Sequence, residues 1–158
     1  MLEVQIFTLY PDLYPGLLDV GIYKKAKEKQ KWSLKIIDIR DYAFDDNRTV
    51  DDTPFGGGSG MLLKPDVVAS ALDKNIKGKE KIIYLSPKGK RLDQKEVKYL
   101  SKLNKINILC GHFEGIDQRL LETRNIEECS IGDFILSGGE SASFAVSYTH
   151  LTLPTTDR

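Results

Sequence analysis

Short apolar runs alternate with apolar positions at helical spacing along most of the 158-residue chain. The runs are bounded by polar residues, Gly or Pro, which predicts β-strands at Leu2–Leu9, Trp32–Ile39, Ile82–Leu85 and Ile106–Cys110. Apolar residues three or four positions apart predict helices at Leu17–Ala26, Pro65–Leu72, Asp93–Lys102 and Ile116–Leu121. Because strands alternate with helices, the pattern predicts an α/β fold with a mostly parallel sheet flanked by helices.

Glycines mark the ends of two of these apolar runs. Gly111 directly follows the run Ile106–Cys110, and a further strand-like run, Ile131–Leu136, is closed by Gly138 and Gly139. A glycine lets the backbone approach a ligand closely, and open α/β sheets bind ligands at the carboxyl ends of their strands. The two glycine-marked ends therefore predict a ligand site, although a simple turn would also explain Gly138–Gly139.

Four motifs carry a resemblance to a known family: IRDYAFDDNRTVDDTPFGGGSGM at 39–61, LSPKG at 85–89, CGHFEGIDQR at 110–119 and SIGDFILSGGE at 130–140. In this order they resemble the bacterial tRNA (guanine-N1)-methyltransferases, and the resemblance covers roughly residues 1–140. It implies a trefoil-knotted SPOUT domain at 1–140 and a cytoplasmic homodimer. It also implies transfer of a methyl group from S-adenosylmethionine to N1 of the tRNA guanine 3′ of the anticodon, position 37.

The resemblance also implies which residues bind S-adenosylmethionine. They lie on the matched motifs and are Leu85, Ser86, Pro87, Gly111, Phe113, Glu114, Ile131, Gly132, Asp133, Phe134, Ile135, Leu136, Gly138 and Gly139. Core packing is the alternative for the aliphatic members. We expect the acidic set of Glu114, Asp117, Asp133 and Glu140 to accept hydrogen bonds from a ligand amine, and we assign no metal site.

No catalytic residue is assigned, because the family's proton-abstracting Asp and its Arg partner lie beyond the knot. After Glu140 the family continues with an apolar helix, a linker and a helical domain, whereas this chain reads SASFAVSYTHLTLPTTDR. Only Ala142–Val146 is suited to begin such a helix. We interpret 141–158 as a tail outside the family pattern, adaptor-derived or out of frame, with a divergent terminus as the alternative. The C-terminal helical domain is thus missing, and we expect this chain alone to be inactive.

Other classes of protein fit the sequence less well. The glycines at 56–60 lack the Lys-Ser/Thr of a P-loop and the spacing of a dinucleotide fingerprint, which disfavours a nucleotidase or an NAD-dependent oxidoreductase. The alternative that stays open is a non-catalytic module that binds S-adenosylmethionine or RNA.

Composition is that of a globular protein, with 41% hydrophobic and 29% charged residues. No apolar run approaches the ~20 residues of a membrane span, and the N-terminus does not resemble a signal peptide. Cys110 and Cys129 are too far apart for a zinc motif and are expected to be reduced core residues. Net charge is zero, but Lys77–Lys105 holds ten Lys or Arg against three acidic residues, a net +7. This segment is either a phosphate-binding face or a solvated surface.

Overall fold

Five parallel strands form the central sheet of the computed structural model, in the order β2-β1-β6-β5-β7. The structure describes residues 1–52, 62–111, 115–132 and 138–147. The strands of this sheet are β1 (Leu2–Thr8), β2 (Trp32–Asp38), β5 (Lys81–Arg91), β6 (Lys105–Leu109) and β7 (Glu127–Ser130). A separate antiparallel pair consists of β3 (Asp51–Asp52) and β4 (Leu62–Leu63).

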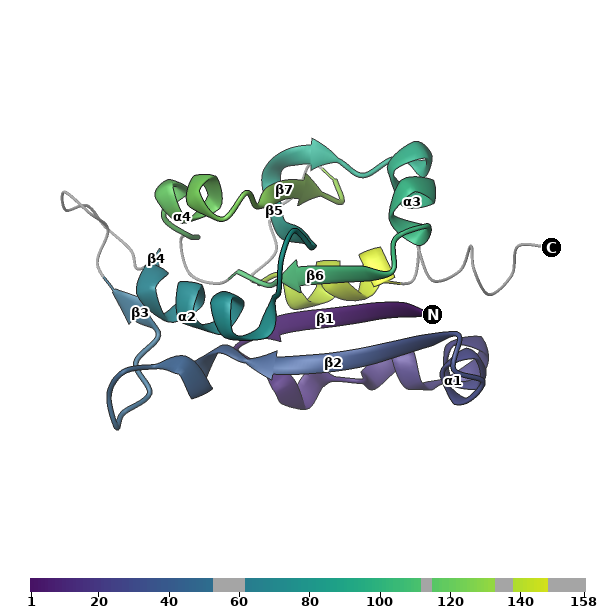
Figure 1. Cartoon of the computed structure of the whole chain (residues 1–158), viewed down its shortest axis with the longest axis horizontal. Helices are drawn as coiled ribbons and strands as arrows, with labels where there is room; N and C mark the ends of the chain where they lie inside the picture. Colours follow the sequence, from purple (N-terminus) through teal and green to yellow (C-terminus); the bar gives the residue numbers. More distant parts are fainter. Residues whose placement is uncertain (53–61, 112–114, 133–137, 148–158) are drawn as a thin grey trace.

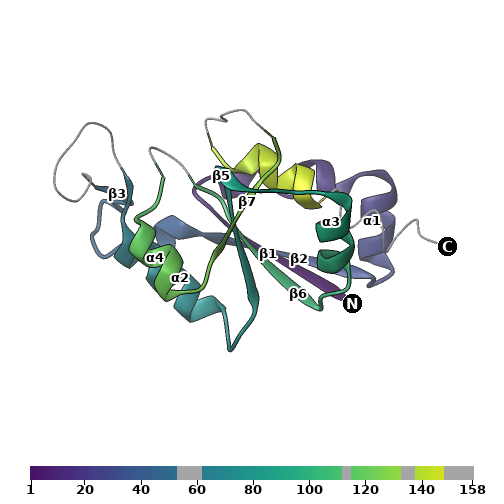
Figure 2. The same cartoon turned by 90° about the horizontal axis from the view of Figure 1, so that it is seen from above.

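Helices cover both faces of the sheet, so the domain has three layers (Figure 1, Figure 2). The α-helices are α1 (Gly21–Glu28), α2 (Pro65–Asn75), α3 (Gln94–Ser101) and α4 (Gln118–Thr123). Three 3-10 helices are η1 (Pro11–Leu13), η2 (Gly16–Asp19) and η3 (Ile39–Tyr42). Residues 140–147 form a further helix. Figure 2 shows it on the same side of the sheet as the N-terminal helices, opposite α2 and α4.

The core has two halves because successive side chains of a strand point to opposite faces of the sheet. On β1, Val4 and Ile6 belong to one half, whereas Phe7 belongs to the other. The first half also contains Leu100 of α3 and Ala142 and Val146 of the helix at 140–147. The second also contains Val67, Val68, Ala71 and Leu72 of α2 and Leu120 and Leu121 of α4. The predicted α/β fold with a parallel sheet flanked by helices is therefore confirmed.

Several predicted elements need correction. The helix expected at Leu17–Ala26 is divided into η2 and α1, because Val20 is extended and Gly21 has a φ of +59°. The strand expected at Ile82–Leu85 continues to Arg91 as β5. The strand-like run Ile131–Leu136 lies mostly outside the described residues, and the strand before it, β7, ends at Ser130 and was not predicted. Its sequence, EECS, is too polar for hydrophobic periodicity to reveal, and it lies at the sheet edge, where polar residues are tolerated.

Other predictions hold closely. Asp93 caps α3, because its side chain accepts a hydrogen bond from the Glu96 amide at 2.8 Å. The segment Ala142–Val146 is helical as expected. Ser143 and Ser147 of this helix are buried. The trefoil knot stays a prediction, because residues 112–114 and 133–137 lie outside the described part of the chain.

Candidate functional site

The carboxyl ends of β1 and β6 meet at the point where the strand order reverses. From β1 the chain proceeds to β2 at one edge, and from β6 it proceeds to β7 at the other edge. Figure 1 shows the arrowheads of β1, β2 and β6 pointing the same way. Just beyond these ends, the Cys110 amide donates to the Phe7 carbonyl at 2.9 Å. Open α/β sheets bind ligands beside such a switch point.

Gly111 and Gly139, both predicted cofactor contacts, lie together at this point. The Gly139 amide donates to the Gly111 carbonyl at 2.9 Å. A Cβ added to Gly139 would lie 2.9 Å from the Cys110 Cα and 3.0 Å from the Gly111 nitrogen. Residue 139 must therefore be glycine for the helix at 140–147 to begin so close to the end of β6.

The Tyr84 ring occupies the space that a side chain at Gly111 would need. An added Cβ there would lie 2.5 Å from Tyr84 Cε1 and 2.7 Å from its hydroxyl oxygen. The close approach inferred from sequence at Gly111 is thus already made to Tyr84 by the chain itself. A bulky substitution at Gly111 would test packing as much as it tests a ligand pocket.

The LSPKG motif, called the LSPKG loop below, forms a bulge within β5 where that strand pairs with β7. Both Leu85 and Lys90 pair with Cys129, so the residues between them leave the ladder. The Leu85 side chain is buried in the core, Ser86 is half-buried and Pro87 is exposed. A ligand at this loop would therefore meet Ser86, Pro87 and the backbone rather than the Leu85 side chain.

Ile131 and Gly132 follow β7 directly and are half-buried. The Ser130 hydroxyl donates to the Gly132 carbonyl at 2.9 Å and accepts from the Gly132 amide at 3.1 Å, which holds this bend next to the LSPKG loop. Gly138 is also half-buried. These half-buried segments lie at the carboxyl edge of the sheet, where backbone donors and acceptors would suit a nucleoside-like ligand. The remaining predicted contacts fall outside the described residues: Phe113, Glu114, Asp133, Phe134, Ile135 and Leu136.

A buried polar cluster, which the sequence did not reveal, lies behind these glycines. The Thr8 hydroxyl donates to Glu140 Oε2 at 2.6 Å, and the Tyr14 hydroxyl shares a hydrogen bond with Ser143. Burial raises the pKa of Tyr14 above its usual value, and the neighbouring Cys110 raises it further. Burial, with a contribution from Glu140, raises the pKa of the Cys110 thiol to about 12. Hydrophobic patterning could not place these polar groups, because their partners come from distant parts of the chain.

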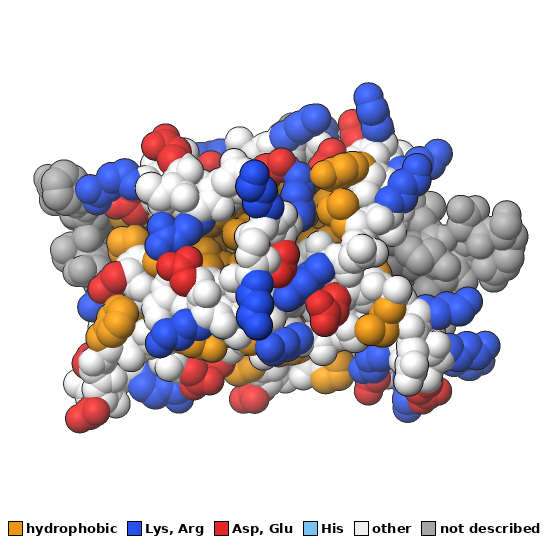
Figure 3. Space-filling model, viewed as in Figure 1, with side chains coloured by type: hydrophobic (Ala, Val, Ile, Leu, Met, Phe, Trp, Pro, Cys, Tyr) orange, Lys and Arg blue, Asp and Glu red, His pale blue; other side chains and the backbone are white. Residues whose placement is uncertain are grey.

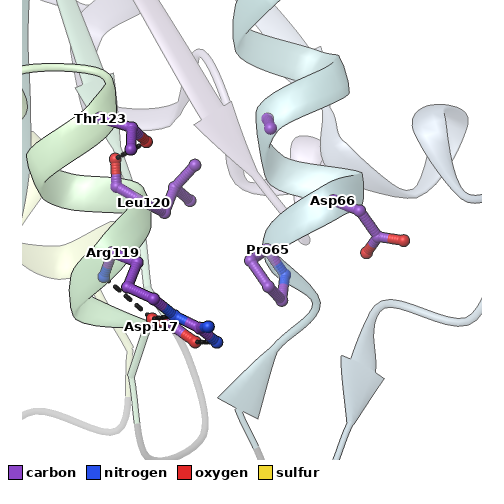
Figure 4. A pocket seen from close by; sticks show the side chains of 7 residues that line it. Pro65, Asp66, Asp117, Arg119, Leu120 and Thr123 are labelled. Atoms are coloured by element: carbon purple, nitrogen blue, oxygen red, sulfur yellow. Dashed lines mark hydrogen bonds and ion pairs between the residues drawn. The ribbon is translucent and has the colours of Figure 1, made fainter.

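An open hollow of about 340 Å³ lies between α2 and α4 (Figure 4). It is lined by Pro65, Asp66, Ala69, Asp117, Arg119, Leu120 and Thr123. Asp117 accepts hydrogen bonds from the Arg119 guanidinium and from its amide, which lowers the pKa of Asp117 to about 2. These donors belong to the chain itself, so the expected hydrogen bonds from a ligand amine to the acidic set stay a prediction. None of the predicted cofactor contacts within the described residues lines this hollow.

The basic segment Lys77–Lys105 does not form one continuous positive surface. Lys81 pairs with Glu127 at 2.5 Å and Lys105 pairs with Glu80 at 3.1 Å. Figure 3 shows Lys and Arg side chains interspersed with Asp and Glu on the visible face. Lys88 and Lys90, at the LSPKG loop, are exposed.

Among the described residues, no helix has the length and apolar character needed to cross a membrane.

This geometry defines a class: α/β proteins with a parallel sheet whose strands end in glycine-marked turns at the carboxyl edge. Within that class the chain belongs to the tRNA (guanine-1)-methyltransferase TrmD family, whose family model matches residues 2–151. The family resemblance inferred from the four motifs is confirmed.

Relatives in several bacteria carry the name tRNA (guanine-N(1)-)-methyltransferase. The protein from Pelagibacter ubique (strain HTCC1062) is 62% identical over 146 residues, which are 92% of this chain and 64% of that protein. The Agrobacterium fabrum protein is 50% identical over 145 residues, with 91% and 62% covered. The Rhodospirillum rubrum protein is 46% identical over 142 residues, with 90% and 59% covered. The chain therefore spans 59% to 64% of the length of these relatives.

Proposed function

We propose that this chain binds S-adenosylmethionine at the carboxyl edge of its sheet and serves methylation of guanine N1, at position 37 of tRNA. The observation that supports the proposal most strongly is the convergence of three family motifs at that edge. The Gly139 amide contacts the Gly111 carbonyl there, and the LSPKG loop leaves the sheet beside Ser130 and Gly132. Backbone groups of these segments would hold the adenosine part of the cofactor.

When bound, the cofactor would supply an electrophilic methyl group. In the transfer, the bond between carbon and sulfur is exchanged for a bond between carbon and N1. The electron pair stays on sulfur, and N1 loses its proton. The chain's contribution is to hold the two reactants in line, which is worth about 7–11 kcal/mol of barrier in well-oriented reactions. We assign no described residue to the removal of the N1 proton. The family's base belongs to sequence after the knot.

The transfer step is best assayed in two proteins. One is the chain itself, and the other continues after residue 147 with the C-terminal part of the Pelagibacter ubique relative. We expect the extended protein to incorporate methyl groups from labelled S-adenosylmethionine into unmodified tRNA, and the 158-residue chain to bind the cofactor with little turnover. Comparable single-turnover rates for the two would refute the assignment of the base. Cofactor binding without transfer in either would favour a non-catalytic binding module.

We propose that tRNA contacts the exposed Lys88 and Lys90 beside the LSPKG loop. Each phosphate contact on a duplex contributes about 0.9 to the slope of log K against log salt. Replacing both lysines with Gln should therefore weaken tRNA binding and reduce that slope by roughly 1–2. Lys81→Gln is the matched control, because Lys81 is engaged by Glu127. An equal effect of the control would remove the LSPKG loop from the RNA face.

We further propose a homodimer that works in the cytoplasm, as the resemblance implies. Support for the dimer comes from apolar side chains on the N-terminal segment, Leu13, Leu17, Val20 and Ile22, which are 41% to 58% exposed. An exposed apolar patch of this kind favours association. Sedimentation that finds only monomer at micromolar concentration would contradict the dimer.

A further inference from the structure

We infer that Thr8 and Glu140 act as a positioning pair that holds the Gly138–Gly139 turn in place for the cofactor. The inference deepens the proposed function and rests on the proposed cofactor site. Glu140 follows the turn directly, and Thr8 is the last residue of β1. Neither side chain is placed to be a cofactor contact itself, because Thr8 is fully buried and Glu140 is 5% exposed.

The hydrogen bond between the two has a defined direction. Thr8 Oγ1 accepts from the Tyr10 amide at 2.9 Å. The hydroxyl hydrogen is therefore left to point at Glu140 Oε2, 2.6 Å away. Hydrogen bonds to ionised acceptors are shorter and about twice as strong as neutral ones. Glu140 also stands at the beginning of a helix, where a negative charge is favoured.

This bond and the Gly139–Gly111 contact hold the turn from two sides. On one side the Gly139 amide donates to the Gly111 carbonyl at 2.9 Å. On the other, Glu140 is held by the end of β1. Because an added Cβ at Gly139 would lie 2.9 Å from the Cys110 Cα, the helix start already lies against β6. Loss of the Thr8 hydroxyl would leave a buried carboxylate with one donor fewer, and the turn would shift toward solvent.

The same helix has a second anchor that provides a matched control. One turn further along, Ser143 shares a hydrogen bond with Tyr14, and the ring of Phe144 stacks on Tyr14 at a centroid distance of 4.9 Å. Tyr14→Phe removes that hydrogen bond but keeps the ring stack. The Ser143 hydroxyl still donates to the Glu140 carbonyl, at 2.6 Å, so Tyr14→Phe should lower stability without moving the turn at 138–139.

The experiment compares the parent chain with Thr8→Val, Thr8→Ser and Tyr14→Phe, at a temperature where all four are folded. Amide exchange of Gly139, followed by NMR without cofactor, reports the position of the turn, and exchange of Ile108 in β6 reports global opening. Calorimetric titration with S-adenosylmethionine reports affinity. For Thr8→Val we expect Gly139 to exchange at least about tenfold faster relative to Ile108, and affinity to fall about tenfold. Thr8→Ser keeps the hydroxyl and should restore both values.

Unchanged exchange at Gly139 in Thr8→Val would overturn the inference, as would an equal change in Tyr14→Phe. A parent chain that does not bind S-adenosylmethionine would instead contradict the proposed function. The two failures are distinguishable, because the exchange measurement needs no cofactor and still decides whether the pair positions the turn.

Discussion

Gly139→Ala tests whether the close contact between the helix at 140–147 and the end of β6 matters. The added Cβ would lie 2.9 Å from the Cys110 Cα and 3.0 Å from the Gly111 nitrogen. Carbon atoms in contact prefer separations of about 3.5–4.0 Å, so the backbone must open by roughly 0.5–1 Å. Both neighbours are backbone atoms, which cannot rotate away as a flexible side chain can.

The magnitude follows from two opposing effects. Overpacking of this kind destabilises by about 1–3 kcal/mol, and the rigid partners place Gly139→Ala in the upper half of that range. Replacing glycine with alanine also reduces the entropy of the unfolded chain, which returns about 0.4–1 kcal/mol. The net loss of about 1–2.5 kcal/mol should lower Tm by roughly 2–10 °C in a chain of this size.

Thermal unfolding by circular dichroism measures this change, and calorimetry measures the affinity for S-adenosylmethionine. The control is Ser141→Ala, since Ser141 is exposed two residues further on. Substitutions at such sites stay within about 0.5 kcal/mol. A Tm for Gly139→Ala equal to that of the control, with unchanged affinity, would show that the contact is not tight and that the account of this site is wrong.

Two further predictions concern ionisable groups. Hydrogen bonds from Arg119 lower the pKa of Asp117 to about 2. Ionised Asp117 therefore stabilises the fold fully above the ordinary Asp pKa of about 3.9. This stabilisation is lost as pH falls through about 2. The stability difference between the parent and Asp117→Asn in urea should therefore shrink from about pH 4 to about pH 2; a difference independent of pH would contradict this. Burial raises the pKa of Cys110 to about 12 and that of Cys129 to about 11. Ellman's reagent at pH 8 should therefore label neither thiol until the chain is unfolded. Rapid labelling of the native chain would contradict the burial of these thiols.

The fold could be predicted largely because its strands are apolar and its helices amphipathic. On β1, Val4 and Ile6 are buried on one face of the sheet, and on β6 Ile106 and Ile108 are buried on the same face. The apolar residues of these two strands are enough to predict this burial from sequence. β7 could not be found in the same way, since its EECS sequence carries no apolar alternation and its place depends on pairing with β5. The division of the first helix depends on the backbone at Val20 and Gly21, which helical spacing does not report.

The candidate site was only partly accessible from sequence. The motif glycines indicate the carboxyl edge of the sheet as the ligand site, and Gly111 and Gly139 are in contact there. What makes each of them necessary is internal packing, against Tyr84 in one case and β6 in the other. Thr8 and Glu140 are 132 residues apart, so no local pattern joins them.

The central claim is that S-adenosylmethionine binds at the carboxyl edge of the sheet. Hydrogen–deuterium exchange with and without saturating cofactor tests it most directly. We predict slower exchange in peptides that cover 85–90, 110–116 and 130–140, and no change in those that cover α2 and the body of α4. Protection confined to the hollow between α2 and α4, or no protection anywhere, would contradict the account.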